Sequence, residues 1–227
     1  MTERQLISTV EEPVSIELAG LLVRGELVVP EDAFGLVLFP AGGGLARANS
    51  RGRRFLQELE EQGLATLAFD LLTGEEETQD NHRAGGLGED VAVLASRIVE
   101  VNKWASAERE LRHLPFGYFG SGPAAAAALA ASTRKDGTVA AIVLRNGRTD
   151  LAENVLADVQ PPTLLLVGAS DAPMVRRNET ALLRLGSARK EMIMIPGSSR
   201  RFEDSAELAT AAELAADWFS RYLILVS

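Results

Sequence analysis

The chain has no cysteine, which excludes disulfide bonds and thiolate metal ligands. It also has no apolar run approaching the ~20 residues that a membrane helix needs. Its first residues lead into no long apolar stretch, so we expect neither a signal peptide nor a membrane span. Together these absences predict a cytoplasmic protein.

The sequence has fewer basic than acidic residues. The 32 aspartates and glutamates outnumber the 23 lysines and arginines, and the net charge is −9. Such a surplus of negative charge provides no attraction to nucleic acid or to an anionic membrane surface, so we expect neither as a partner.

What is present is the pattern of a parallel sheet wrapped by helices. Short apolar runs alternate with longer amphipathic segments, and 227 residues suit one α/β domain spanning residues 1–227. Two neighbouring runs, 14–18 and 21–29, predict an N-terminal antiparallel hairpin. Further strands are predicted at 35–39, 65–69, 116–119, 139–144, 163–167 and 192–195, and helices at 51–62, 89–103, 123–132, 173–185 and 205–223. The polar, acidic segment 71–88 is predicted to be a long surface loop.

One segment identifies the fold. After the strand at 116–119, the tight turn Gly120-Ser121-Gly122 passes directly into the alanine-rich helix at 123–132. A strand, a glycine-rich turn and a helix in immediate succession are the parts of a nucleophile elbow, which exposes a catalytic side chain above a sheet.

With this segment the chain resembles the dienelactone-hydrolase-like branch of the α/β-hydrolases. Four further stretches resemble that family in order and spacing: 38–44, 63–73, 145–151 and 162–171. A fifth, 195–202, stands in place of the family's histidine loop. The resemblance implies a three-layer α/β-hydrolase fold, with a mostly parallel sheet of about eight strands.

The resemblance also implies that the catalytic residues have been replaced. At equal length the serine position falls on Gly122, which has no nucleophile, and the histidine position falls on Arg200, which stays protonated at neutral pH. The oxyanion donor after the nucleophile would be Pro123, which has no N–H, and the oxyanion-loop histidine corresponds to Ala41. Only Asp171, the triad acid, is retained. We therefore expect no ordinary serine hydrolysis.

An active hydrolase that uses Ser121 remains the rival interpretation. Ser121 lies one residue before the elbow position and would need a base. The chain has only two histidines. His82 lies in a polar segment typical of a solvated loop, and His113 precedes the elbow strand, at the end of the sheet opposite the expected site.

The rim of the predicted site is basic, although the protein is acidic. Five arginines belong to loops expected at the carboxyl ends of strands, where open α/β sheets bind ligands: Arg47, Arg51, Arg145, Arg148 and Arg200. The amides of Gly42 and Gly43 and the N-terminus of the helix at 123–132 also favour an anion. These features predict binding of a carboxylate- or phosphate-bearing small molecule.

A structural interpretation stands beside this one. Arg145 and Arg148 can form an ion-pair cluster with Asp150, and Arg200 can pair with Asp171 and close the site, leaving a scaffold that acts through a protein partner or as a homo-oligomer. No cofactor motif is present, because no Gly-Lys-Ser/Thr follows the glycines after the strand at 35–39. Zinc-ligand spacing is absent, so we expect no metal.

Overall fold

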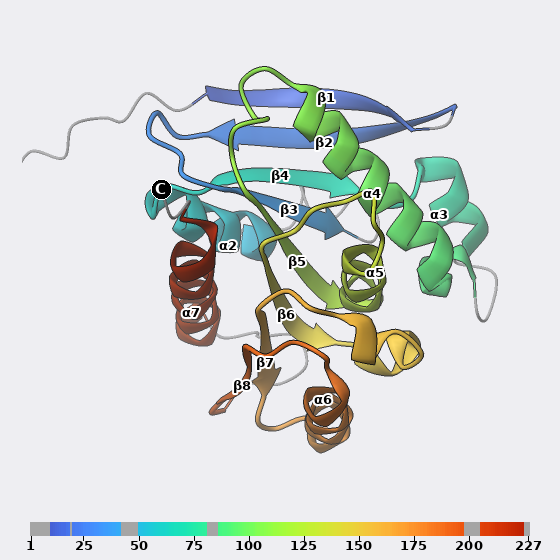
Figure 1. The fold of residues 1–227 in the computed structure, drawn as a ribbon, viewed down its shortest axis with the longest axis vertical. Helices are drawn as coiled ribbons and strands as arrows, with labels where there is room; N and C mark the ends of the chain where they lie inside the picture. The colour runs from blue at the N-terminus through green and yellow to red at the C-terminus, as the bar shows by residue number, and fades with distance from the viewer. Residues whose placement is uncertain (1–9, 19, 42–49, 81–85, 198–204, 225–227) are drawn as a thin grey trace, which may run out of the picture.

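The computed structural model of the chain describes residues 10–18, 20–41, 50–80, 86–197 and 205–224. Eight strands form one sheet in the order β1-β2-β4-β3-β5-β6-β7-β8 (Figure 1). Their bounds are β1 Val10–Leu18, β2 Leu21–Val29, β3 Leu36–Ala41, β4 Ala65–Asp70, β5 Phe116–Gly122, β6 Ala141–Gly147, β7 Thr163–Gly168 and β8 Lys190–Ile195. β3 to β8 run parallel, whereas β1 and β2 form an antiparallel hairpin and β2 is antiparallel to β4. The predicted fold class and N-terminal hairpin are confirmed.

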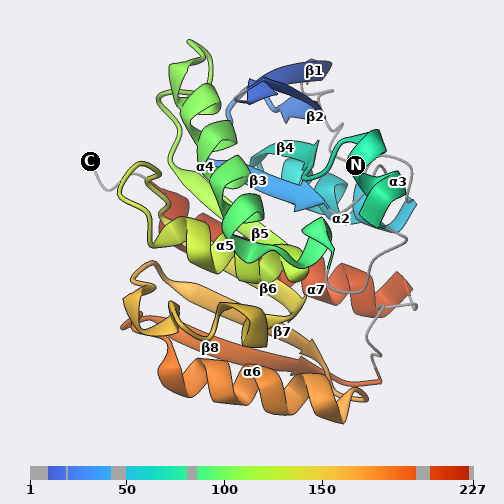
Figure 2. The same ribbon diagram turned by 90° about the vertical axis from the view of Figure 1, so that its right-hand side faces the viewer.

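Helices cover both faces of the sheet (Figures 1 and 2). α2 (Ser50–Glu61) and α7 (Ser205–Leu223) lie on one face, and α4 (Val91–Ala107), α5 (Pro123–Ser132) and α6 (Ala172–Arg184) lie on the other. Each face has its own hydrophobic cluster, since successive side chains of a strand point to opposite sides of the sheet. Trp104 packs against the cluster beneath α4 to α6, and Trp218 belongs to the cluster beneath α2 and α7.

Small residues let α5 lie against the sheet at close range. A Cβ atom added to Gly120 would lie 2.6 Å from the Cα atom of Ala125, and one added to Gly147 would lie 2.7 Å from the Cβ atom of Ala125. No side chain fits at such distances, so the glycines of β5 and β6 and the alanines of α5 together fix where this helix begins.

The segment predicted to be a long surface loop contains two helices, so that prediction is wrong. α3 covers Gly74–Asp80, and a 3₁₀ turn covers Leu87–Glu89. A reciprocal capping box begins α3: the Thr73 N–H donates to the Glu76 carboxylate at 2.8 Å, and the Glu76 N–H donates to the Thr73 hydroxyl at 3.3 Å. The buried Arg97 of α4 also binds Glu76 through both guanidinium NH₂ groups, at 2.6 and 2.8 Å. Contacts of this kind hold a short polar helix that has no apolar stripe.

Two further 3₁₀ turns, Thr149–Ala152 and Leu156–Asp158, connect β6 to β7. Among the helices in the described part of the chain, none is long and apolar enough to cross a membrane.

Candidate functional site at the end of β5

Gly122 forms the sharp turn between β5 and α5. Its φ of 53° and ψ of −131° lie in a region that side chains rarely adopt, and it serves as the N-cap of α5. A Cβ atom added here would meet no atom of the described residues within 4 Å, in contrast to the crowded Gly120 two residues earlier. The backbone therefore has the strained turn of a nucleophile elbow, with open space where a nucleophilic side chain would project.

Ser121 ends the regular part of β5 beside Arg145 of β6, with which it is in register. Its side chain is half-buried. Among the residues that the structure describes, no hydrogen bond joins its hydroxyl to a basic nitrogen. The structure thus offers no general base for Ser121 within the described residues.

The guanidinium of Arg145 lies over two phenyl rings at the same end of the sheet. Its Cζ atom is 5.3 Å from the ring centroid of Phe55 in α2 and 5.7 Å from that of Phe119 in β5. Phe119 in turn stacks on Phe39 at 4.4 Å between ring centroids. Stacking of this kind restricts the guanidinium plane without neutralising its charge.

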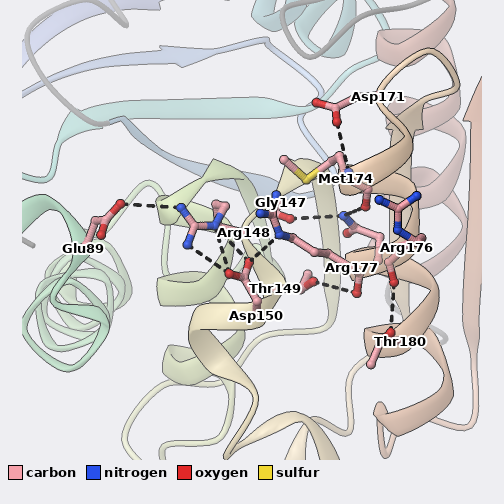
Figure 3. A network of polar contacts seen from close by, with 11 residues as sticks. Glu89, Gly147, Arg148, Thr149, Asp150, Asp171, Met174, Arg176, Arg177 and Thr180 are labelled. Carbon is pink, nitrogen blue, oxygen red and sulfur yellow. Dashed lines mark hydrogen bonds and ion pairs between the residues drawn. The ribbon is translucent and has the colours of Figure 1, made fainter.

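Arg148 is held by carboxylates (Figure 3). Its guanidinium donates to both oxygens of Asp150 at 3.0 to 3.1 Å and lies 3.6 Å from Glu89. Arg177 of α6 approaches the other side of Asp150, at 3.9 Å. Burial alone would raise the pKa of Asp150, but the hydrogen bonds and charge of Arg148 outweigh it and leave that pKa below its ordinary value. The predicted pairing of Arg148 with Asp150 is present.

Asp171 follows β7 and caps α6. Its carboxylate accepts a hydrogen bond from the Met174 N–H at 3.1 Å (Figure 3), the usual contact of an N-cap aspartate. The carboxyl end of β7 is joined to β6 by Asn146, a buried residue with a φ of 45°. The side-chain oxygen of Asn146 accepts a hydrogen bond from the N–H of Gly168, the last residue of β7, at 2.9 Å. Asp171 therefore sits beyond the carboxyl end of β7, two strands from Gly122 in the sheet order.

Several predicted site residues lie outside the described residues: Arg47, Gly42, Gly43 and Arg200, together with His82. Arg51 is the second residue of α2, and its side chain is also outside that part. Ala41 is the last residue of β3 and is buried.

His113 lies at the opposite end of the sheet from Gly122, as predicted. It precedes β5 and lines a hollow with Val29, the last residue of β2, and with Pro30, which follows that strand.

The first amides of any helix lack acceptors within the helix, and α5 begins directly after Gly122. The guanidinium of Arg145 lies over Phe55 and Phe119, which belong to the hydrophobic cluster of the α2 and α7 face. In the described part of the chain, no three His, Asp or Glu side chains gather as a metal site would require.

No family model matches the chain. A crystal structure of dienelactone hydrolase from Anabaena variabilis superposes with a TM-score of 0.88 and is 41% identical, covering 95% of this chain and 99% of its own. The esterase domain of a Rhodothermus marinus protein superposes with a TM-score of 0.71 at 17% identity, over 94% of this chain and 99% of its own, a likeness of fold alone.

Among curated proteins, one from Mycobacterium tuberculosis, named "Putative phosphoribosyl transferase", is 38% identical over 213 residues. The match covers 94% of this chain but 47% of the relative. The chain thus spans about half the length of the curated relatives that it matches.

Proposed function

The chain belongs to the dienelactone hydrolase family, and from this premise we propose that it is a non-hydrolytic member that binds a small phosphate- or carboxylate-bearing molecule beside the elbow. The observation that carries the proposal is the backbone of Gly122, which has the turn of an elbow and no nucleophilic side chain, and no atom of the described residues lies within 4 Å in its Cβ direction. Pro123 supports it further, because a proline at the oxyanion position cannot donate an N–H.

The anion preference rests on two groups near the carboxyl ends of the neighbouring strands β5 and β6. Arg145 provides a fixed positive charge stacked on Phe55 and Phe119. The N-terminus of α5 adds the helix dipole and amides in its first turn, which favour negative charge by about 0.3–1 kcal/mol at an exposed site. Arg148 is a second candidate ligand, held in place by Asp150 and Glu89.

The name of the Mycobacterium tuberculosis relative favours phosphate over carboxylate. A phosphoribosyl transferase handles a sugar phosphate, and this chain corresponds to about half of that relative. On this ground we propose a phosphorylated sugar, or a compound that carries one, as the preferred ligand.

The test has two parts. A fluorophosphonate probe should leave Ser121 unlabelled in the folded protein, as read by intact mass and peptide mapping. Stoichiometric, heat-sensitive labelling of Ser121 would instead establish the rival hydrolase.

In the second part, ribose 5-phosphate, inorganic phosphate and succinate are titrated by calorimetry against the native chain and an Arg145→Gln variant. Phosphate compounds should bind the native chain, and the variant should bind at least tenfold more weakly, as expected when a charge-assisted contact is lost. Arg221→Gln is the matched control, because Arg221 also lies over an aromatic ring, that of Trp218, but on α7. No binding of any anion, or equal losses in both variants, would exclude an anion site at Arg145.

A further inference from the structure

The two edges of the sheet differ in how well they resist pairing with a further strand. β1 forms one edge and β8 forms the other (Figure 1). β1 contains Pro13, which has no N–H, and the exposed side chains of Glu11, Glu12 and Glu17. Proline and charge on an edge strand discourage pairing with another chain. β8 contains no proline, and its residues 192–195 are all apolar, so this edge lacks the protection that β1 has.

Alternate residues of β8 have backbone groups that the sheet does not use. The carbonyl oxygens of Arg189 and Ile195 accept hydrogen bonds, at 2.8 and 3.0 Å, from N–H groups at the start of β7 and directly after it. Backbone groups of successive residues in a strand point to opposite edges, so the odd-numbered residues of β8 bond to β7. The N–H and C=O groups of Lys190, Met192 and Met194 therefore point away from the sheet. Such a row of donors and acceptors is a template for another strand.

The side chains along this edge are apolar on both faces of the sheet. Met192 packs against the cluster beneath α4 to α6, Ile193 packs against the cluster beneath α2 and α7, and both are only partly buried. Met194 is 53% exposed. Three consecutive apolar side chains that water reaches are unusual on a surface without a function. They indicate that this edge is covered in solution.

A second copy of the chain fits the edge when the two β8 strands run antiparallel about a two-fold axis at Ile193. Met192 of each copy then lies opposite Met194 of the other, and each such pair exchanges both backbone hydrogen bonds. Every apolar side chain of the edge faces an apolar one. An axis at Met192 would instead bring the two Glu191 side chains diagonally next to each other, which is an unfavourable like-charge contact.

Opposite charges meet at both ends of this pairing. With Ile193 on the axis, Arg189 of one copy lies opposite Gly197 of the other. The Glu207 carboxylate is beside that glycine, because one of its oxygens is 3.1 Å from the position of a Cβ atom added to Gly197. Within the described residues, neither the Arg189 side chain nor the Glu207 side chain has an ion pair. Each therefore gains an opposite charge in the pair of chains, which favours this partner and this register.

We propose that the chain forms a two-fold homodimer through the β8 edge, in which the sheets of the two copies join into one continuous sheet with Ile193 on the axis. β6 and β7 lie between β8 and β5 in the sheet, so the pairing leaves the space beside Gly122 uncovered. The dimer does not depend on the proposed anion site, and a failure of either proposal leaves the other intact.

Analytical ultracentrifugation tests the dimer. The native chain should show a reversible dimer, and Met194→Lys should raise its dissociation constant at least tenfold, because the new ammonium would lie against Met192 and near Lys190 of the second copy. Leu183→Lys is the matched control, since Leu183 is 83% exposed on α6, outside the edge. A native chain that stays monomeric up to about 1 mM, or an equal shift in the control, overturns the proposal.

A cross-link tests the register, and the absence of cysteine from the chain makes it specific. In an Ile193→Cys variant the two Cα atoms would be about 4.5 Å apart across the axis, within the range of a disulfide. In Glu191→Cys, the control on the same face of the same strand, the two positions would be about 13 Å apart along the strand. Oxidation followed by non-reducing electrophoresis should give a covalent dimer from Ile193→Cys alone. No dimer from that variant, or an equal yield from Glu191→Cys, contradicts the register.

A charge exchange tests the ends of the interface without a new contact in the core. Arg189→Glu should weaken the dimer at least tenfold, because two like charges then meet Glu207 of the other copy. The double variant Arg189→Glu/Glu207→Arg should restore the native dissociation constant. Circular dichroism establishes that each variant is folded. A folded single variant that dimerises as the native chain does, or a double variant no better than the single one, overturns the pairing of Arg189 with Glu207.

Discussion

The backbone N–H of Arg148 donates to the carbonyl oxygen of Gly122, with 2.9 Å between nitrogen and oxygen. This bond ties the loop after β6 to the turn between β5 and α5. Because Asn146 in turn binds the Gly168 N–H at the end of β7, three successive strand ends are joined by hydrogen bonds. The strained turn at Gly122 is thus supported by its neighbours and does not depend on its own sequence alone.

Gly120 should tolerate no side chain. In a Gly120→Ala variant the new Cβ atom would lie 2.6 Å from the Cα atom of Ala125 and 2.9 Å from its nitrogen, so backbone must move. We expect a loss of about 1–3 kcal/mol in the free energy of unfolding, measured by urea denaturation. Gly74→Ala is the control, because a Cβ atom there meets nothing within 4 Å. Equal stability of the two variants would contradict the close packing of α5.

Gly122→Ser should fold but should not hydrolyse esters. The side chain has open space, while the φ of 53° costs a serine about 1–3 kcal/mol. The family resemblance puts Arg200 at the histidine position, and no base is bound at this turn within the described residues. We therefore expect hydrolysis of p-nitrophenyl acetate above the native rate only in the double variant Gly122→Ser/Arg200→His. Even there the rate should stay low, since loss of an oxyanion donor typically costs about 10²–10³-fold. Activity in the single variant would show that another base reaches the elbow.

The large features of the fold could be predicted because each has a strong local signal. The sequence predicts the alanine-rich helix at 123–132, the bounds that α5 has, since a proline begins it and small apolar side chains follow. α3 was missed because its residues are polar. Yet Thr73 and Glu76 stand at the spacing of a capping box, a signal that sequence reasoning could have used.

The site was harder to predict than the fold. Register and backbone geometry place Ser121 beside Arg145 and give Gly122 its turn, but the stacking of Arg145 on Phe55 joins residues 90 positions apart, which no local pattern encodes. A hollow lined by residues 20–24 and by residues 70, 72–75 and 77 likewise arises from two segments that meet only in the folded chain.

Acid should weaken the attachment of α3. Hydrogen bonds from Arg97 hold the pKa of Glu76 below its usual 4.5 in the folded protein. The folded pKa is the lower one, so the contribution of Glu76 is complete above pH 4.5 and is lost as the pH falls through the folded value. Glu76→Gln should lose about 1–3 kcal/mol at pH 7, because Arg97 is left buried without a counter-charge, and this loss should shrink toward pH 3. Urea unfolding of the native chain and of the variant at several pH values measures the loss in the free energy of unfolding and its change with pH. A loss that does not depend on pH would contradict the ion pair.

Removal of the Arg148 guanidinium should affect stability more than binding. Arg148→Met leaves Asp150 with the weaker contact to Arg177, so we expect a lower melting temperature, by roughly 2–4 °C for a chain of this size. Affinity for ribose 5-phosphate should change less than twofold, in contrast to Arg145→Gln. A larger loss of affinity in Arg148→Met would make Arg148 a ligand of the anion and Arg145 the structural residue.

Because the hydrophobic residues form two clusters, tryptophan fluorescence can follow the unfolding of each layer separately. Each layer contains one of the two tryptophans, Trp104 beneath α4 to α6 and Trp218 beneath α2 and α7, where its indole N–H donates to the Pro162 carbonyl at 3.4 Å. Emission from a chain in which one indole is replaced by phenylalanine therefore follows a single layer. Different unfolding midpoints in the two single-tryptophan chains would show that one layer unfolds before the other. Coincident unfolding midpoints would show that the two layers unfold together, in one cooperative transition.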